Sequence, residues 1–436
     1  MHKLLLPLAL AVLVLPTVCA QTAMPAESAL TAAWDAQPVE PNGSLSLAAA
    51  LRLTYNANPD IAVARREIQA MEGTILQAQT IRNPEITTSI EDTRQDTRTK
   101  TFQLSQPFEL GGKRAARISA SQRGYDAAVL ELEVKQAEVR AAVVAAFYNV
   151  VTAQERFRLA QATAELAKRA TEIASKRVLA GKVSPVEETR ARVAESGVRV
   201  ELAQAGSELQ TSRRRLSAMW GNPVARFNSA VNQFETLPTL PEPEELMRGL
   251  SKAPIIRRAR MEVDRRQALT RVELSRRVPD LTVSLGVKRD EQLGRNQAIV
   301  GISIPIPLFD RNQGNVLEAV RRTDKARDEL VATEVRLNSE LGQAYDRLNV
   351  SRQETELLRQ EVLPGAQSAY DATTKGYELG KFNFLEVLDA QRTFFQARSQ
   401  YLRALAETHR SAAEIDRIVG IPFAENSGNA MYQEQK

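Results

Sequence analysis

Cysteine is almost absent from this chain of 436 residues. The single cysteine, Cys19, lies in the apolar N-terminal stretch, so a chain that loses this stretch can form no disulfide bond. Histidine is nearly as scarce, and outside the N-terminal stretch there is only His409. One histidine on a helix does not make a metal site, so we expect no protein-bound metal ion and no cofactor.

Long apolar runs and enzyme motifs are missing as well. Beyond the N-terminal stretch no run of about 18 apolar residues occurs, so no transmembrane helix is predicted. If the protein enters a membrane, closed β-structure is the remaining alternative. Neither a nucleophilic triad nor a phosphate-binding loop is apparent, so we do not expect an enzyme. At a net charge of +5 the basic residues alternate with acidic ones, which predicts solvated helix faces and no nucleic-acid partner.

The N-terminus has the three regions of a secretory signal peptide, and we predict that residues 1–20 are removed on export. Residues 2–3 supply positive charge, residues 4–15 are apolar, and small residues precede Gln21. Lipidation of Cys19 is an alternative, but Val18 is a poor residue before a lipidated cysteine, so ordinary cleavage is favoured.

The stretch 113–180 has 68 residues, no proline and one glycine. As a helix it would be about 100 Å long, more than a single globular core needs, so we predict that it packs against other long helices. Its first half has apolar residues spaced alternately three and four apart: Ala127, Leu130, Val134, Ala137, Ala141, Val144, Tyr148 and Val151. Beyond them, a second seam is predicted at Leu159, Ala162, Leu166 and Ile173.

The same order of elements occurs twice in the chain. Landmarks recur at offsets of 195 to 199 residues: Pro59 and Pro84 as Pro254 and Pro279, Ser105 and Pro107 as Ser303 and Pro305, Gly181 and Lys182 as Gly380 and Lys381. We therefore predict a tandem duplication. Its parts are a flexible N-terminal segment (21–43), a first repeat (44–221), a linker (222–253), a second repeat (254–420) and a C-terminal tail (421–436).

Each repeat is predicted to contain two strands, a long helix and a return helix. In the first repeat these are residues 85–92, 101–108, 113–180 and 184–219, and in the second 281–288, 298–304, 312–379 and 383–418. Alternation is clearest at Leu281, Val283, Leu285 and Val287, which predicts strands with one apolar face. Pro364-Gly365 falls inside the second long helix and predicts a kink or a short break there.

Four strands are too few for a membrane barrel, whose smallest members have about eight, so closure would need several chains. Four segments of the chain, taken from both repeats, resemble a known family. The segments that carry the resemblance are Asn58-Pro-Asp60, Ser105-Gln-Pro-Phe-Glu-Leu-Gly-Gly-Lys-Arg114, Ile304-Pro-Ile-Pro-Leu-Phe-Asp-Arg-Asn-Gln-Gly314 and Gly376-Tyr-Glu-Leu-Gly-Lys-Phe-Asn-Phe-Leu-Glu-Val-Leu-Asp-Ala390. Both repeats resemble TolC-like outer-membrane efflux proteins, and residues 307–314 are most similar to the cobalt-zinc-cadmium branch.

The resemblance implies a mainly α fold with membrane β-structure. In such proteins a homotrimer forms a 12-stranded β-barrel in the outer-membrane lipid above a long periplasmic α-helical barrel. The trimer is the exit channel of a tripartite efflux system, completed by a periplasmic adaptor (membrane fusion protein) and an inner-membrane RND pump. The cargo implied by this branch is divalent heavy-metal cations, and the location is the Gram-negative outer membrane.

The resemblance also implies functional positions at the periplasmic end. Glu386 and Asp389 match an acidic pair that lines the tunnel entrance, although both could also be ordinary solvated residues. Tyr377 matches a gate tyrosine, while a gate arginine of the family is replaced here by Phe382. The adaptor is expected to dock on two helical turns, where each glycine would in any case end a helix. These turns comprise Ala180, Gly181, Lys182 and Val183, and Leu379, Gly380, Lys381 and Phe382.

Two other functions remain open from the sequence. A channel of this kind could serve multidrug efflux or type I protein secretion, because the inner-membrane pump selects the cargo. A protein of another class, a soluble periplasmic coiled-coil scaffold or adaptor, would have no need for four strands with alternating apolar residues.

Overall fold

The computed structural model describes residues 40–231, 237–379, 381–382 and 384–420. The predicted signal peptide, most of the predicted flexible segment, the C-terminal tail and Gly380 lie outside these ranges. The helices are α2 (Leu47–Ala57), α3 (Pro59–Gln79), α4 (Lys113–Leu179), α5 (Pro185–Ala218), α6 (Pro243–Leu250), α7 (Pro254–Ser275), α8 (Gln313–Leu357), α9 (Leu363–Glu378) and α10 (Phe384–Val419). The strands are β1 (Ser44–Leu45), β2 (Glu85–Glu91), β3 (Thr99–Phe108), β4 (Ser229–Ala230), β5 (Leu281–Asp290) and β6 (Arg295–Ser303).

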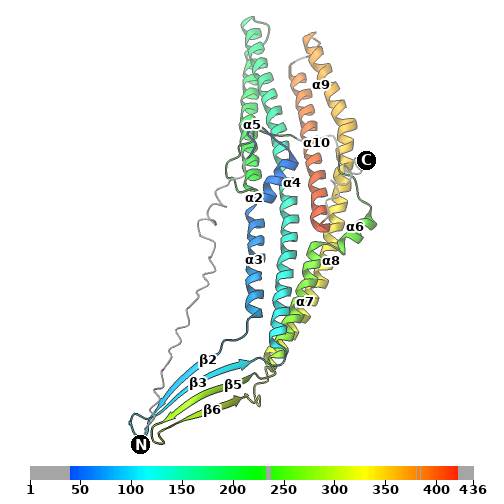
Figure 1. Ribbon diagram of the computed structural model, residues 1–436. Helices are drawn as coiled ribbons and strands as arrows, with labels where there is room; N and C mark the ends of the chain where they lie inside the picture. The colour runs from blue at the N-terminus through cyan, green and yellow to red at the C-terminus, as the bar shows by residue number, and fades with distance from the viewer. Residues whose placement is uncertain (1–39, 232–236, 380, 383, 421–436) are drawn as a thin grey trace, which may run out of the picture. The chain divides into compact units, whose positions relative to one another are not determined.

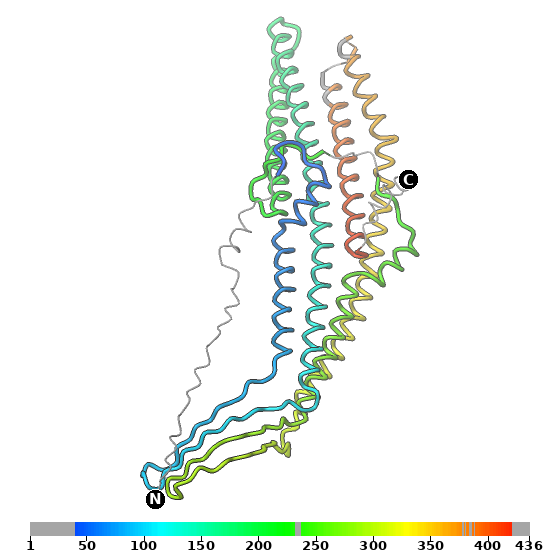
Figure 2. Tube along the Cα trace, viewed as in Figure 1, coloured from blue at the N-terminus to red at the C-terminus, as the bar shows by residue number. Residues whose placement is uncertain are grey.

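The long helices lie side by side in a single row. Near the strands the order of contacts is α3, α4, α7 and α8, and farther away it is α5, α4, α10 and then α8 with α9. The chain path in Figure 2 shows that the strands lead directly into helices of this row. Because the row is one helix thick, α3 and α5 lie at one edge and α8 and α9 at the other. No helix within the described residues is both long and apolar enough to cross a membrane.

Four strands form one antiparallel sheet in the order β2, β3, β5, β6, so the hairpins of the two repeats meet at the β3–β5 pair. The register places Ile86, Leu104, Leu285 and Val300 opposite one another on one face. Phe102, Val287 and Ile302 share this face, and all of these side chains are exposed. The other face carries mainly polar residues, among them Thr87, Gln103, Ser284 and Gln297. The apolar alternation predicted from the sequence is therefore present in the sheet.

The β3–β5 contact is closest at Gly286. A Cβ atom at this position would lie 2.7 Å from the carbonyl oxygen of Phe102, closer than real Cβ contacts allow. Glycine is therefore required where the two repeats join, since a side chain would push the paired backbones apart.

The centre of α4 is buried between neighbouring helices. Five of the eight residues of the predicted first seam are buried, namely Leu130, Val134, Val144, Tyr148 and Val151. The other three, Ala127, Ala137 and Ala141, are partly buried, so the seam is confirmed in part. All five buried residues except Leu130 belong to clusters of buried residues that draw on both repeats.

The predicted second seam is wrong. Leu159 and Leu166 are only partly buried, and Ala162 and Ile173 are exposed. The buried residues beyond Val151 are Ala153, Ala160, Ala167 and Ala170, of which the first three are seven positions apart. In this part of the chain α4 contacts both α5 and α10, and small side chains on a helix let neighbouring helices approach it closely. The spacing of apolar residues in the sequence had instead favoured the larger side chains of Leu159, Leu166 and Ile173.

The segment 222–253 contains more structure than a linker needs. Helix α6 lies within it and directly precedes α7, as α2 precedes α3 in the first repeat. Strand β4 pairs with β1, so the predicted linker and the start of the first repeat are joined. The buried Glu40 carboxylate adds to this junction by accepting hydrogen bonds from the Arg226 and Phe227 amides and from the Asn222 side chain.

The second long helix departs from α-geometry just before its proline. A π-helical turn, η1 (Leu358–Val362), separates α8 from α9, and the Leu363 amide donates to the Leu358 carbonyl five residues back. In a continuous α-helix the Pro364 ring would clash with the carbonyl four residues earlier, so the wider turn accommodates it. The equivalent part of α4 has no proline and stays α-helical.

Candidate functional site

The two turns expected to form one functional end of the protein lie at the same end of the helix row, the end distant from the sheet (Figure 1). In the first turn the Lys182 amide donates to the Arg177 carbonyl at 2.9 Å, and Gly181 has φ +69°. This bond, spanning five residues, ends the helix as in a Schellman motif, for which glycine is the preferred residue. Leu179, beside this turn, is 85% exposed.

The second turn repeats this backbone bond. The Lys381 amide donates to the Gly376 carbonyl at 2.8 Å, the bond expected from the offset of 199 residues. The Phe382 ring lies where a Cβ atom of residue 376 would be, so glycine makes room for it. Leu379, Lys381 and Phe382 are exposed. Gly380 and the side chain of Tyr377 lie outside the description, so the predicted gate position keeps its status as a prediction.

Glu386 and Asp389 lie near the start of α10, three residues apart and therefore on one side of the helix. Both are exposed. Asp389 pairs with Arg392 at 3.1 Å, but the two side chains are 69% and 73% exposed, so water screens the pair and the carboxylate stays accessible. Glu386 lies in the first helical turn, where the helix dipole favours a negative charge.

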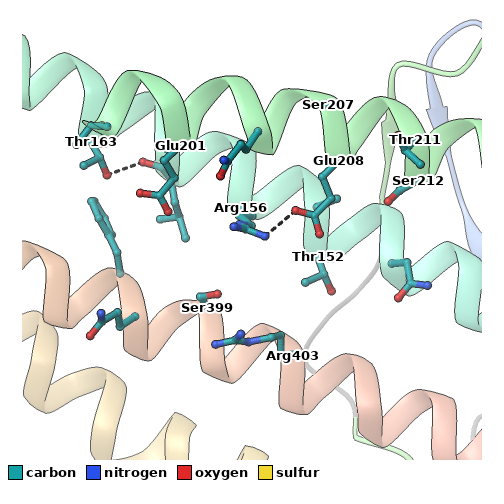
Figure 3. Close-up of a pocket in the computed structure, with 18 of the residues that line it drawn as sticks. Thr152, Arg156, Thr163, Glu201, Ser207, Glu208, Thr211, Ser212, Ser399 and Arg403 are labelled. Atoms are coloured by element: carbon teal, nitrogen blue, oxygen red, sulfur yellow. Dashed lines mark hydrogen bonds and ion pairs between the residues drawn. The ribbon is translucent and has the colours of Figure 1, made fainter. Parts of the chain in front are cut away.

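Asp389 also lies at one border of a groove between α10 and the α4–α5 pair. The groove has a volume of about 1710 Å³, and Glu386 is not among its lining residues. Figure 3 shows Arg156 and Glu208 facing each other from α4 and α5, with Ser399 and Arg403 opposite on α10. Arg156 and Glu208 pair at 2.6 Å. The walls of the groove therefore carry both signs of charge.

The described residues contain no group of three His, Cys, Asp or Glu that could hold a metal ion. His409, which we did not assign as a ligand, has a different environment. Its ring stacks on Tyr148 of α4 at 4.1 Å between centroids and 11° between planes. Burial lowers the pKa of His409 to about 4, so the imidazole is neutral at physiological pH.

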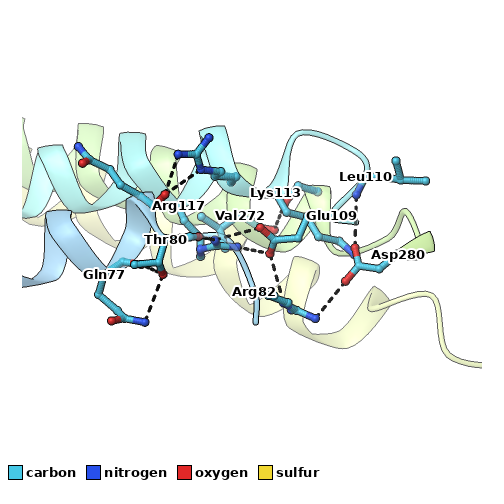
Figure 4. A network of polar contacts seen from close by, with 12 residues as sticks. Gln77, Thr80, Arg82, Glu109, Leu110, Lys113, Arg117, Val272 and Asp280 are labelled. Carbon is cyan, nitrogen blue, oxygen red and sulfur yellow. Dashed lines mark hydrogen bonds and ion pairs between the residues drawn. The ribbon is translucent and has the colours of Figure 1, made fainter. Parts of the chain in front are cut away.

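Charged side chains form a network where the strands meet the helices (Figure 4). The Glu109 carboxylate pairs with Arg117 and, at 3.4 Å, with Arg82. Asp280 pairs with Lys113 at 2.5 Å and with Arg82 at 3.2 Å. The Glu109, Asp280 and Lys113 side chains are 8%, 17% and 12% exposed, so these charges depend on their partners.

This network joins the two repeats, because Asp280 precedes β5 whereas the other members surround the first hairpin and the start of α4. The hydrogen bond from Arg117 to Glu109 raises the arginine pKa above its ordinary value. Sequence reasoning missed the network. Glu109 and Lys113 lie within a family-like segment of the sequence. Asp280, the partner of Lys113, is 167 residues away, so no local pattern in the sequence predicts this pair.

Comparisons with known proteins agree with this architecture. The family model described as outer membrane efflux protein matches residues 50–222 and 247–421. The cobalt-zinc-cadmium resistance protein CzcC of Cupriavidus metallidurans is 47% identical over 420 residues, which cover 96% of this chain and 100% of CzcC. The nickel-cobalt-cadmium resistance protein NccC of Alcaligenes xylosoxydans xylosoxydans is 28% identical over 64% of this chain and 65% of its own length.

Among solved structures, the CmeC outer membrane channel of Campylobacter jejuni superimposes with a TM-score of 0.73. The alignment covers 89% of each chain at 16% identity, so it bears on the fold alone. The outer-membrane channel OprN gives a TM-score of 0.72 at 19% identity and covers 87% of this chain and 90% of its own. The predicted, mainly helical channel fold is confirmed at this level.

The buried imidazole generates a prediction about acid stability. An unfolded chain takes up a proton on His409 below about pH 6.5, but the folded chain does so only near pH 4. The contribution of His409 to the free energy of unfolding should therefore be constant above pH 6.5 and decrease as the pH drops toward 4. At pH 4.5 the loss from this one group should be about 2–3 kcal/mol. Urea unfolding of wild type and His409→Gln at pH 7 and pH 4.5 measures this loss.

Carboxylates titrate in the same pH range and also change the stability of both proteins. The effect of His409 is therefore the difference between wild type and variant in the free energy of unfolding lost on acidification. The variant should be less stable than wild type at pH 7 because the stacking on Tyr148 changes, yet lose less stability on acidification. An equal loss in both proteins would mean that His409 is protonated in the folded state.

Proposed function

The chain belongs to the outer membrane efflux protein family, and we propose that it is the outer-membrane exit channel of a tripartite RND-type system that exports divalent cations of the cobalt, zinc and cadmium class. One structural observation carries the channel assignment: a four-stranded sheet exposes a continuous apolar face, and its strands lead into long helices. The metal assignment rests on the similarity to CzcC along nearly the whole chain. We assign the protein no enzymatic activity.

The sheet has the dimensions that an outer membrane requires. Strand β3 has ten residues, so it is about 34 Å long and about 26 Å high when tilted by ~40°. The apolar band of outer-membrane strands is about 25 Å high. In this arrangement the face with Ile86, Leu104, Leu285 and Val300 contacts lipid, and the polar face lines the channel. A soluble scaffold would gain nothing from such an exposed face.

Closure of the sheet needs further copies of the chain, because β2 and β6 each have a partner on one side only within the described sheet. Strand β2 starts at the helix side and β6 ends there, so β6 of one copy can pair antiparallel with β2 of the next. We propose three copies, which makes 12 strands and a tube of 12 helical columns. Every backbone group at membrane depth would then have a partner.

The helix edges support the same pairing. Positions are counted at about 1.5 Å per residue from the end of each helix nearest the sheet, which is Gln79 in α3 and Gln313 in α8. Val63 then lies about 24 Å along α3 and Val331 about 27 Å along α8. Leu76 and Leu317 lie at about 5 and 6 Å. All four side chains are exposed, and α4 and α7 separate α3 from α8 within one chain. They match in height across a boundary between copies.

Cysteine pairs can test this arrangement, because the chain without its predicted signal peptide has no cysteine. The double variant Val63→Cys, Val331→Cys should give covalent dimers and trimers on oxidation in membranes, seen on a non-reducing gel. Val63→Cys with Val350→Cys is the control, because Val350 is equally exposed but about 55 Å along α8. Equal cross-linking of both pairs, or of neither, would contradict the proposed register.

At the entrance we propose that Glu386 and Asp389 of three chains form a ring of six carboxylates. Such a ring favours cations over anions. Their exposure and their common side of α10 support this role. Tyr377 is proposed to contribute to the gate, and the two helical turns, 180–183 and 379–382, to receive the periplasmic adaptor. Phe382 carries no charge, so this gate would not use an ion pair at that position.

The carboxylate ring predicts a change in ion selectivity. In planar bilayers the double variant Glu386→Gln, Asp389→Asn should lose cation preference and become less sensitive to block by multivalent cations, because six negative charges disappear from the constriction. Glu187→Gln is the control: Glu187 occupies the equivalent position in the first repeat, where Arg190 stands in place of the aspartate. Unchanged selectivity in the double variant would remove both residues from the entrance.

The cargo is tested by growth. A host lacking this protein should grow less well on cobalt, zinc and cadmium and unchanged on drugs and detergents, and the gene should restore growth on metals. Leu179→Glu with Leu379→Glu should fail to restore it while the purified channel still conducts, because these exposed side chains lie at the proposed docking turns. Sensitivity confined to drugs would keep the channel and reject the metal cargo, and a loss of protein secretion would point to type I export.

A further inference from the structure

Beyond the helix-side end of the sheet, both repeats keep large apolar side chains exposed. We call this group the junction belt: Phe108, Leu110, Ile304, Ile306, Leu308 and Phe309. Phe309 is 91% exposed, Ile306 77% and Leu308 64%, while Leu110, the least exposed member, is still 40% exposed. The sheet itself ends at Phe108 in β3 and at Ser303 in β6, so the belt is largely outside it.

The belt continues the apolar face of the sheet. In β3 this face carries the even-numbered Phe102 and Leu104, and Phe108 and Leu110 keep the same alternation. In β6 the face carries Val300 and Ile302, followed by Ile304, Ile306 and Leu308. The chain then bends, since the Leu308 amide donates to the Ile306 carbonyl at 2.9 Å, and Phe309 follows this bend.

The backbone of this segment has few unpaired donors. Pro305 and Pro307 have no N–H group, and the Leu308 amide is already bonded within the segment. An unpaired N–H costs several kcal/mol in hydrocarbon, so a segment with fewer such groups can approach the apolar layer outside a sheet at a lower cost. Pro107 has the same effect at the end of β3.

Charges begin immediately beyond the belt. Asp310 and Arg311 follow Phe309, and both are exposed. Glu109 and Lys113 follow Phe108 but turn into the buried network with Arg82, so they do not interrupt the apolar surface. Going from the sheet toward the helices, the belt is therefore the last apolar part of the surface, and charged residues follow it. The same change from apolar to charged occurs in a bilayer where acyl chains meet headgroups.

A neighbouring copy of the chain cannot cover the whole belt. Phe108 and Leu110 extend from β3, which lies between β2 and β5 inside the sheet. In the proposed trimer, contacts between copies occur at the β2 and β6 edges, and β3 is one strand away from β2 and two strands away from β6. Only a partner that surrounds the assembly reaches the belt segments of both repeats.

We propose that the junction belt lies in the interfacial layer of the lipid bilayer on the helix side and sets how deeply the sheet enters the membrane. The partner is lipid at the level where headgroups meet acyl chains, and the side chains that enter it are Phe309, Ile306, Leu308 and Phe108. This proposal rests on the proposed outer-membrane location of the sheet, and it adds a definite position for its lower boundary.

Single cysteines labelled with a fluorophore can locate the belt in the full-length protein, reconstituted in vesicles of phosphatidylcholine and phosphatidylglycerol. The three sites are Phe309→Cys in the belt, Val300→Cys on the apolar sheet face, and Leu179→Cys, exposed but at the far end of α4. Nitroxides are placed on the lipid headgroup or deep in the acyl chain. The label at 309 should be quenched most by the headgroup nitroxide, the label at 300 most by the acyl-chain nitroxide, and the label at 179 by neither.

The outcomes separate the two proposals. If the label at 300 is quenched and the label at 309 is not, the belt proposal fails while the membrane location stands. A label at 309 shielded from lipid nitroxides and from aqueous iodide alike would indicate that a protein surface covers it. If no label is quenched, the sheet is not in the membrane and the proposed function fails as well.

Depth control has its own test. Replacing Ile306 and Phe309 together by serine should change the ratio of headgroup to acyl-chain quenching at position 300, because the sheet loses its lower anchor. Serine at both Leu179 and Leu379 is the matched control, since it removes two exposed apolar side chains far from the sheet. An unchanged ratio in the belt variant would overturn the proposed role in setting depth.

Discussion

Unpaired edges of the sheet are the constraint on which the rest of this structure depends. A strand in lipid has no water to satisfy its N–H and C=O groups, so a sheet that exposes an apolar face must close on itself. Within the described residues, this sheet has four strands and two open edges, β2 and β6. The helix row has matching open edges at α3 and α8. In the proposed trimer, the same boundary between copies therefore has to satisfy hydrogen bonds in the sheet and apolar contacts between helices.

The junction between sheet and helices has to hold two different kinds of structure together. Strands twist and helices supercoil, and the chain changes from one to the other within a few residues, as at Gly111 and Gly112, which both have positive φ. The paired charges of Glu109, Asp280, Arg82, Lys113 and Arg117 hold the two repeats in one position at this level. Outward-facing apolar residues and inward-facing ion pairs thus occupy the same short segments.

The two repeats have diverged where they differ in task. The first long helix, α4, is continuous over 67 residues and packs at its centre against helices of both repeats. The second is divided by the π-turn before Pro364, and the acidic pair of Glu386 and Asp389 lies only on its return helix. Departure from regular helix geometry and the proposed entrance charges thus occur in the same repeat.

Much of this protein could be predicted from its sequence. Local patterns predicted the long helix, the first apolar seam, the alternating strands and a disturbance near Pro364, because helix and strand periodicity depend on near neighbours. The repeated landmarks and the family-like segments predicted a member of the outer-membrane efflux family, and the match to the family model confirms this membership. The similarity to CzcC supports the proposed metal cargo. Tertiary structure alone decided which seam α4 buries beyond Val151, which charges pair at the junction, and that residues 222–253 contain α6. The physical reason is distance along the chain: α4 packs against helices of both repeats, and Lys113 pairs with Asp280 across 167 residues, which no local pattern records.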